Sequence, residues 1–284
     1  FGISRFAFDE LLYRTALKAG VQFLFDTATA ISYGADEFAV STASGNEIRA
    51  KIAIGAYGKR SGLDKHLKRG FSNQKSPWLG VKCHYAHNDF PEDLVALHNF
   101  EGGYAGLSKT ESGAVNCCYL TTFESFKKYG SIPEFNQACV AKNPHLGAFL
   151  ESAKPLFEKP LSIAQISFAQ KQPVVNHVLM CGDSAGLIHP LCGNGMAMAI
   201  HAGKLAAEGV LSYFKDEKWS REALEDWYTK QWRQHFGSRL RMGRQLQRLL
   251  LNDKASAIAM QTVARSKKIV RSMIRRTHGK PILV

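Results

Sequence analysis

A run of nineteen residues in the second half of the chain constrains the fold more than any other segment. Residues 181–199 read CGDSAGLIHPLCGNGMAMA. The apolar residues 174–181 predict a buried strand, and the small and apolar residues that follow predict a helix over about 195–214. A strand that ends in a glycine-rich loop before a long helix indicates an α/β domain, which binds its ligand at the carboxyl ends of the strands.

The residue types in this run predict which groups would contact a ligand. Gly182 has no side chain to block a close approach at the end of the strand. Asp183 then presents a carboxylate at the strand edge, and Pro190 stiffens the loop. Gly193 and Gly195 allow backbone N–H groups to face the ligand. The helix that begins near Gly195 adds its positive end, so negative charge that develops on a ligand would be stabilised there.

Other interpretations of the same run stay open. Asp183 can serve only to cap a turn, since Gly-Asp-Ser-Ala-Gly is a common turn composition. The same five residues match the G-x-S-x-G nucleophile elbow, which would make Ser184 the nucleophile of a serine hydrolase; the helix of such an elbow follows the serine directly, whereas here it begins about ten residues later. Gly193-x-Gly195 lacks the third glycine of a dinucleotide-binding fingerprint.

The run resembles the strand–GD–loop–P-x-x-G-x-G–helix motif of a flavoprotein superfamily that contains aromatic hydroxylases and geranylgeranyl reductases. The resemblance implies FAD as the cofactor, with the carboxylate of Asp183 accepting hydrogen bonds from the ribityl chain. It implies a mixed α/β fold: a p-hydroxybenzoate-hydroxylase-like FAD domain with an inserted antiparallel substrate sheet and C-terminal helices. The cofactor-binding residues that we expect are Gly182, Asp183, Pro190, Gly193, Asn194, Gly195, Met196 and, near the start of the chain, Arg5.

A second segment resembles the same superfamily. Residues 54–61, IGAYGKRS, match its G-A-D-G-x-x-S motif at Gly55, Gly58 and Ser61, with Tyr57 in place of the aspartate. That aspartate supports pyrophosphate binding and NADPH use in the hydroxylases. Its replacement makes an NADPH-consuming ring hydroxylase a weaker expectation, and the electron donor stays open between NAD(P)H and another reductant.

The resemblance extends over nearly the whole chain, since residues 3–21 resemble a helix and strand midway through the superfamily's FAD domain. The first βαβ unit of that domain, with its G-x-G-x-x-G fingerprint, has no counterpart here. We therefore expect a fragment that lacks about a hundred residues, an estimate from usual βαβ sizes. A non-catalytic fragment is one alternative that follows. The domain boundaries that we expect are 1–62 and 173–214 for the two parts of the FAD domain, 63–172 for the substrate sheet and 215–284 for a basic helical region.

Hydrophobic periodicity and turn residues predict the order of the elements. The predicted helices span 5–19, 134–151 in two pieces, and 195–214. The predicted strands are 21–25, 37–42, 46–50, 51–58, 78–87, 94–99, 103–108, 113–121, 161–169 and 174–181.

Two histidines are the catalytic candidates. His189 lies inside the loop that the resemblance places at the flavin. Alternation along a strand puts His84 and Lys82 on one sheet face, and the resemblance places this sheet over the reactive face of the flavin. Either imidazole can relay protons during reduction or hydroxylation; a solvated surface is the alternative for His84. The other lining candidates are residues 82–85, 98–99 and 102–104.

The substrate expected from these motifs is a small apolar organic molecule. Prenyl reductases of the superfamily carry Tyr-x-Trp-x-Phe-Pro near Tyr104, whereas this chain reads YAGLS from that position, and the Trp-rich motif of flavin halogenases is absent. The expected function is therefore FAD-dependent double-bond reduction or monooxygenation, in lipid or secondary metabolism.

Most of the net charge of +13 belongs to the end of the chain. Residues 215–284 hold 17 of the 37 Lys and Arg and 6 of the 24 Asp and Glu, which gives this segment +11. Residues 236–251 predict a basic amphipathic helix. Its apolar face carries Met242, Leu246, Leu249 and Leu250, and its opposite face carries Arg241, Arg244 and Arg248. Such a helix can pack on the FAD domain or contact an anionic membrane surface. Nucleic acid is not expected as a partner, because no recognised nucleic-acid module is present.

Six cysteines, at 83, 117, 118, 139, 181 and 192, form no C-x-x-C pair and no zinc-type spacing. They predict reduced thiols in a cytoplasmic protein without a metal site. No apolar run reaches the roughly 18 residues of a membrane span, and the opening is not typical of a signal peptide. We therefore expect a cytoplasmic protein whose membrane contact, if any, is peripheral. No feature indicates an oligomeric state.

Overall fold

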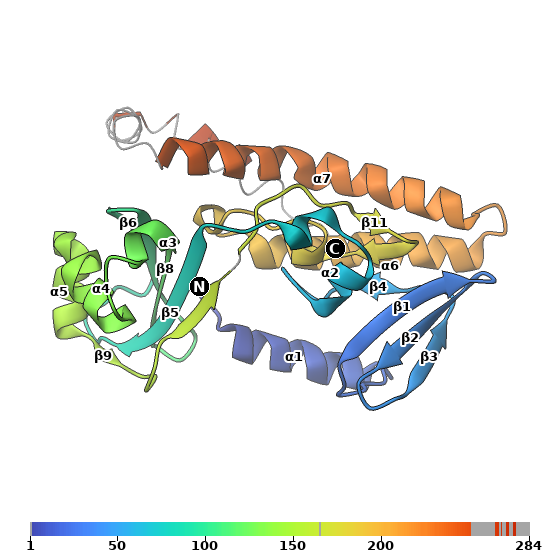
Figure 1. The fold of residues 1–284 in the computed structure, drawn as a ribbon, viewed down its shortest axis with the longest axis horizontal. Coiled ribbons are helices and arrows are strands. Elements are labelled where there is room, and N and C mark those ends of the chain that lie inside the picture. Colours follow the sequence, from blue (N-terminus) through green and yellow to red (C-terminus); the bar gives the residue numbers. More distant parts are fainter. Residues whose placement is uncertain are drawn as a thin grey trace. The chain divides into compact units, whose positions relative to one another are not determined.

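The computed structural model describes residues 2–164 and 166–250 and, further along, residues 265, 266, 268, 271, 272, 275 and 276. The chain forms two compact units, whose elements are labelled in Figure 1. Unit 1 comprises residues 1–25 and 75–166, and unit 2 comprises residues 26–74 and 167–284. The opening residues, which we assigned to the FAD domain, therefore lie in the same unit as the central sheet. The functional boundaries stay a prediction.

Unit 1 contains an antiparallel sheet of six strands among the described residues, in the order β10-β5-β8-β7-β6, with β9 also paired to β5. Short helices follow the last long strand. The strands are β5 (Trp78–Ala86), β6 (Val95–Phe100), β7 (Gly103–Lys109), β8 (Val115–Thr122), β9 (Lys154–Pro155) and β10 (Leu161–Ala164). The helices are α1 (Arg5–Lys18), α3 (Phe123–Phe126), α4 (Ile132–Ala138), the 3₁₀ turn η2 (Val140–Lys142) and α5 (Pro144–Ser152).

Strand alternation gives the sheet of unit 1 two different faces. One face packs on α4 and α5, where Phe135 and Leu146 are fully buried against Val81, Cys83 and Tyr85 of β5. The other face carries the alternate residues. They include Lys82, His84, Tyr104, Leu97, Leu161 and Ile163. The side chains of Leu97, Leu161 and Ile163 are 45–59% exposed, so this second face offers apolar surface.

The described residues of unit 2 form two small sheets. The first is an antiparallel meander of β1 (Ala28–Gly34), β2 (Glu37–Thr42) and β3 (Glu47–Ala50). The second has the order β11-β12-β4: β12 (Val178–Met180) runs parallel to β4 (Ile54–Gly55) and antiparallel to β11 (Val174–Val175). The short helix α2 (Gly62–His66) and the 3₁₀ turn η1 (Gly70–Asn73) follow β4.

The described part of unit 2 also contains two long helices, α6 (Gly195–Lys215) and α7 (Arg221–Leu250), which form a helical hairpin (Figure 1). Two 3₁₀ turns, η3 (Gly182–Ser184) and η4 (Pro190–Cys192), lie between β12 and α6. The fully buried Tyr228 of α7 donates a hydrogen bond from its hydroxyl to the carbonyl of Met180, 2.7 Å away. This bond and the apolar core around it fasten α7 to the strand that leads into the glycine-rich loop.

Several predicted strands were wrong in detail. Residues 21–25 are not a strand, and the first strand of the meander is instead β1. The predicted strand 174–181 is a hairpin, because Asn176 and His177 both adopt positive φ, at 47° and 67°, and reverse the chain between β11 and β12. The predicted strands 51–58 and 161–169 shrink to β4 and β10. Within the described residues, no helix combines the length and the hydropathy needed to cross a membrane.

Candidate functional site

The loop of residues 181–195 begins where β12 meets α6. Gly182 has φ of +57°, and a Cβ atom built there would lie 3.1 Å from the Cβ of Ala199 on α6. A side chain at this position would meet both backbone strain and a close contact. The sequence folds this way locally because glycine alone allows the strand to turn so near the helix, and the turn holds Asp183 half-buried at the end of β12.

Helix α6 begins directly after the loop. Gly193 has φ of +58° with open space where a Cβ would stand, and Asn194 is the N-cap residue, 5% exposed. The side chain of Asn194 makes no capping hydrogen bond, and the first turn holds no acidic residue. The first-turn N–H groups and the positive end of a 21-residue helix therefore meet at Gly195, an arrangement that stabilises negative charge on a ligand.

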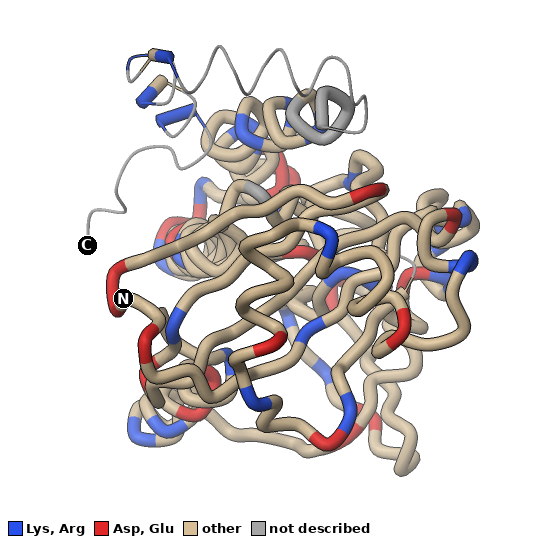
Figure 2. The backbone as a smooth tube through the Cα atoms, turned by 90° about the vertical axis from the view of Figure 1, so that its left-hand side faces the viewer, with Lys and Arg blue, Asp and Glu red and all other residues tan. Residues whose placement is uncertain are grey.

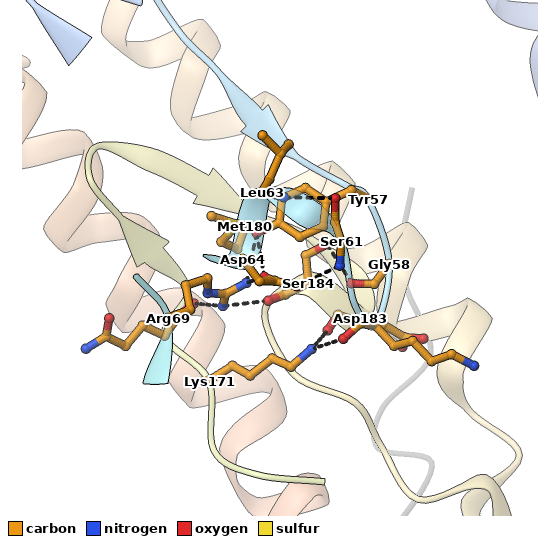
Figure 3. A network of polar contacts seen from close by, with 12 residues as sticks. Tyr57, Gly58, Ser61, Leu63, Asp64, Arg69, Lys171, Met180, Asp183 and Ser184 are labelled. Atoms are coloured by element: carbon orange, nitrogen blue, oxygen red, sulfur yellow. Dashed lines mark hydrogen bonds and ion pairs between the residues drawn. The ribbon is translucent and has the colours of Figure 1, made fainter. Parts of the chain in front are cut away.

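Two cationic side chains hold the backbone of the Gly182-Asp183-Ser184 turn (Figure 3). The amine of Lys171 donates to the carbonyl of Asp183 at 2.7 Å and to that of Lys59 at 2.8 Å. The guanidinium of Arg69 donates to the next carbonyl, that of Ser184, at 2.8 Å. Both cations are buried, so two consecutive carbonyls of the turn are fixed by charged donors. The position of these two carbonyls determines where the carboxylate of Asp183 lies.

Burial changes the protonation behaviour of the amines near the turn. It lowers the pKa of Lys171 to about 8, with the positive charge of Arg69 as a second cause. Burial also lowers the pKa of Lys59, and the negative charge of Asp183 opposes that shift. Lys59 and Asp183 are therefore close enough to interact electrostatically, although our sequence analysis singled out only Asp183.

The segment after β4 forms a buried polar network around Tyr57 (Figure 3). The Tyr57 hydroxyl donates to Asp64 Oδ1 at 3.0 Å and accepts from Arg69 Nη1 at 2.9 Å. Arg69 and Asp64 form an ion pair at 2.9 Å, with side chains 4% and 0% exposed. Asp64 also accepts from the backbone N–H of Ser61 at 2.8 Å. Burial raises the pKa of Tyr57 to about 12, so it stays a neutral hydroxyl.

Sequence analysis missed Asp64, Arg69 and Lys171. A signal for Asp64 was present, because Ser61-x-x-Asp64 has the spacing of a capping box, and the structure forms that box at the start of α2. Lys171 and Arg69 have polar or charged neighbours in the sequence, so nothing there distinguishes them from exposed cations.

His189 lies within the loop and is 3% exposed. Its ring packs against Phe168 with centroids 4.8 Å apart. Burial lowers its pKa to about 4, so the imidazole is neutral near pH 7. A neutral imidazole can accept or donate one hydrogen bond but adds no positive charge to the site. The catalytic role of His189 stays a prediction.

The other two candidates, His84 and Arg5, lie in unit 1. His84 is on β5, where burial lowers its pKa and its ring lies 4.9 Å from that of Phe157. Arg5 is on α1, largely exposed, and forms an ion pair with Asp9 at 3.0 Å. Unit 2 thus brings together the loop residues from Gly182 to Met196, and the roles of His84 and Arg5 stay predictions.

Ser184 is poorly placed for the serine-hydrolase alternative. The side chain is fully buried, and its hydroxyl donates to the carbonyl of Gly58 at 3.1 Å. A serine nucleophile needs an accessible hydroxyl next to a base. The hydrogen bond of Ser184 instead links the turn that follows β12 to the turn that follows β4.

Helix α7 packs on the outside of the loop. A Cβ at Gly186 would lie 3.0 Å from side-chain atoms of Trp232 and Leu240, and a Cβ at Gly243 would lie 3.3 Å from the Cβ of His189 and 3.6 Å from the sulfur of Cys192. As far as Gly243, the structure agrees with the interpretation in which the basic helix packs against the rest of the protein. The side chains of the predicted apolar leucines at 246, 249 and 250 lie outside the described set.

Comparisons with known proteins bear on both fold and family. No protein-family model matches the chain. The chain is 26% identical over 244 residues to the digeranylgeranylglycerophospholipid reductase 1 of Methanosphaera stadtmanae, a match over 81% of this chain and 57% of that protein. The corresponding reductase of Methanosarcina acetivorans is 25% identical over 266 residues, 89% of this chain and 63% of its own length. The chain thus spans about three fifths of these curated relatives.

Solved structures show the fold. The flavin-dependent brominase Bmp2 matches with a TM-score of 0.75 at 15% identity, over 98% of this chain and 70% of its own. A geranylgeranyl bacteriochlorophyll reductase-like protein of Thermoplasma acidophilum gives 0.70 at 16% identity, over 96% and 72%. HpxO of Klebsiella pneumoniae, solved with FAD and uric acid, gives 0.70 at 14% identity, over 95% and 71%.

The fold and the relatives therefore agree with the motif of residues 181–199. The mixed α/β fold expected from the sequence is confirmed by the solved structures, and the flavoprotein resemblance is confirmed by the distant relatives. The chain is thus similar over most of its length to digeranylgeranylglycerophospholipid reductases, and it has the p-hydroxybenzoate-hydroxylase-like fold of FAD-dependent oxidoreductases.

Proposed function

We propose that this chain provides the flavin-binding loop and the substrate sheet of an FAD-dependent reductase that acts on an apolar, isoprenoid-type substrate. The observation that carries the proposal is the geometry of the loop. A strand ends in the tight turn at Gly182, Asp183 follows it, and a long helix begins without a side-chain cap at Gly195. Similarity to these reductases, and to a solved structure that contains FAD, supports FAD as the cofactor.

The loop residues fit that cofactor. Gly193 leaves open space beside the backbone where a planar ring could approach, and Gly182 lets the end of β12 turn close to α6. Bound FAD supplies transfer of electrons and hydride. In this proposal the carboxylate of Asp183 accepts hydrogen bonds from the ribityl hydroxyls, and the first-turn amides of α6 stabilise negative charge on the ring. Lys171 and Arg69 hold the turn, and the buried imidazole of His189 excludes water from its side of the loop.

An apolar substrate is supported by the sheet of unit 1 and by the names of the relatives. The face away from α4 and α5 exposes Leu97, Leu161 and Ile163 beside Lys82 and His84. This mixture suits a hydrocarbon chain with a few polar groups that orient it. The two curated relatives are named as reductases of a digeranylgeranyl phospholipid. We therefore favour reduction of isoprenoid double bonds over monooxygenation.

The first test is flavin binding by the full-length protein that contains this chain. Visible absorbance of the purified protein would be compared with that of Asp183→Ala and, as a control that also removes a carboxylate, Asp216→Ala at the other end of α6. Loss of an acceptor for hydroxyl donors should weaken flavin binding about ten- to a hundredfold in the Asp183 variant only. A folded protein that binds no flavin even with added FAD would overturn the proposal.

The second test identifies the reaction. The flavin-loaded protein would be reduced under nitrogen with dithionite and mixed with a digeranylgeranyl glycerophospholipid, and the product mass would be measured. Reduction adds two hydrogen atoms per double bond without oxygen. A product that forms only in air and gains an oxygen atom would assign monooxygenation instead. A lipid left unchanged under both conditions would argue against this substrate class.

A further inference from the structure

A groove of about 640 Å³ lies within unit 2, between α7 and the segment of residues 169–173. Its lining contains four basic residues and no acidic one. The basic residues are Lys171, Arg233, Arg241 and Arg244; the other lining residues are Ala169, Gln170, Gln172, Pro173, Gly186, Leu187, Trp232, Gly237 and Leu240. A concave surface with one sign of charge concentrates ions of the opposite sign.

The three arginines share one side of α7. At about 100° per residue, positions 233, 241 and 244 fall within an arc of about 80°. Arg233 and Arg241 are exposed and Arg244 is half-buried. Gly237 lies between them on the same side of the helix, with open space where its Cβ would stand. The three arginines and Gly237 therefore line the same groove from one side of α7. Figure 2 marks the lysines and arginines along the backbone in blue, those of α7 included.

The charges of these arginines are not neutralised within the described part of the chain. Three exposed arginines elsewhere are paired: Arg5 with Asp9, Arg14 with Glu10, and Arg49 with both Glu37 and Glu47. The ion pairs found among the described residues include none of Arg233, Arg241 and Arg244. Three unpaired positive charges that line one groove raise its electrostatic potential, and a bound anion would offset that charge.

We propose that this groove is a binding site for a phosphate group. Each guanidinium offers a planar fork of N–H donors that matches the oxygens of a phosphate. The amides of Gln170 and Gln172 line the opposite wall and supply further donors. The floor is apolar, because Trp232 and Leu240 cover Gly186 there. The site is therefore suited to a phosphate whose neighbouring atoms are apolar, either on a lipid headgroup or on a free phosphorylated compound.

The proposal is independent of the flavin, since the amine of Lys171 is already bonded to two carbonyls and the arginines belong to α7. Binding would be measured by isothermal titration of the full chain with inorganic pyrophosphate, and by co-sedimentation with vesicles of phosphatidylglycerol and phosphatidylcholine. Arg241→Gln and Arg244→Gln would be compared with Arg49→Gln. The control removes the same charge from unit 2 at a residue outside the groove. Arg244→Lys keeps the charge but loses the fork.

Each glutamine variant should bind pyrophosphate roughly tenfold more weakly, because a hydrogen bond to a charged group is lost. Arg49→Gln should bind as the parent does, and Arg244→Lys should fall between them. The same ranking with vesicles would identify a lipid headgroup as the source of the phosphate. The same ranking with pyrophosphate alone would identify a free compound. No binding in either assay, or equal binding by the groove variants and the control, would overturn the proposal. Circular dichroism of each variant shows whether a loss of binding is caused by unfolding.

Discussion

Replacing Lys171 with methionine should remove a specific part of the dependence of stability on pH. The Lys171 side chain is buried, and burial lowers its pKa from the usual 10.5 to about 8. Near pH 7 the amine is protonated in both the native and the unfolded chain. The native state then carries the full penalty of a desolvated charge, which for this shift is about 3 kcal/mol.

The penalty disappears as the pH rises. Above pH 8 the native protein releases the proton, whereas the unfolded chain keeps it up to about pH 10.5. Because the unfolded state then binds one more proton, the free energy of unfolding rises by about 1.4 kcal/mol per pH unit across this window. The contribution of Lys171 is thus absent at neutral pH and present at alkaline pH. Methionine has no proton to lose, so its contribution to the free energy of unfolding does not change with pH.

Methionine also loses the hydrogen bonds to the carbonyls of Lys59 and Asp183, which would cost about 1–3 kcal/mol for each carbonyl left unpaired. At pH 7 this loss and the relief of the buried charge nearly cancel. Between pH 7 and pH 10 the parent should gain about 2–3 kcal/mol over the variant. Urea unfolding followed by tryptophan fluorescence measures this difference, since Trp219, Trp227 and Trp232 belong to unit 2. The exposed Lys230→Met is the control. Parallel curves for the parent and Lys171→Met would refute the reasoning.

Three other substitutions test the packing around the loop by urea unfolding. Arg69→Met should lower stability by about 3–5 kcal/mol, because it leaves the fully buried Asp64 without its cation; adding Asp64→Asn should restore part of the loss, and no recovery would contradict a charge-based cause. Gly182→Ala should cost about 1–2 kcal/mol from its positive φ alone, and more if the contact with Ala199 does not relax; an unchanged stability would mean that the turn differs from the one described. Tyr228→Phe should cost about 1–2 kcal/mol through the lost hydroxyl bond to β12, and a neutral result would show that bond to be unimportant.

The sequence contained strong signals for the sheet of unit 1 and for α6. Residues 78–122 alternate apolar and polar side chains between glycine-containing turns, and the predicted strands differ from the observed ones by two residues at most. The 21 residues of α6 begin at the predicted glycine and end one residue past the predicted end. In both regions a regular pattern extends over many residues, so local errors do not accumulate.

The weaker predictions fell where tertiary structure overrides local pattern. β1 reads ATAISYG, which has little apolar alternation and carries an irregularity between Ala28 and Ala30. The hairpin at Asn176 and His177 was missed because residues other than glycine adopt positive φ only in a few per cent of cases, and here two consecutive residues do so. At the candidate site, the loop motif predicted the tight turn at Gly182 and the start of α6 at Gly195, and which of its residues contact a ligand stays a prediction. The motif did not predict Lys171 and Arg69, which fix that loop from distant positions and which only the folded chain brings to it.

The rate at which the thiol of Cys192 reacts with an alkylating reagent can report how often the glycine-rich loop opens. The thiol is 2% exposed, and burial raises its pKa to about 11, so the closed loop protects the sulfur both by denying access and by withholding the thiolate. An alkylating reagent can modify this sulfur only while residues 190–195 are displaced from α7. The rate of modification therefore counts openings of the loop. A bound molecule that keeps the loop closed lowers the alkylation rate by the same factor by which it stabilises the closed state. Alkylation of this one sulfur atom therefore reports both the opening of the loop and the presence of a bound ligand.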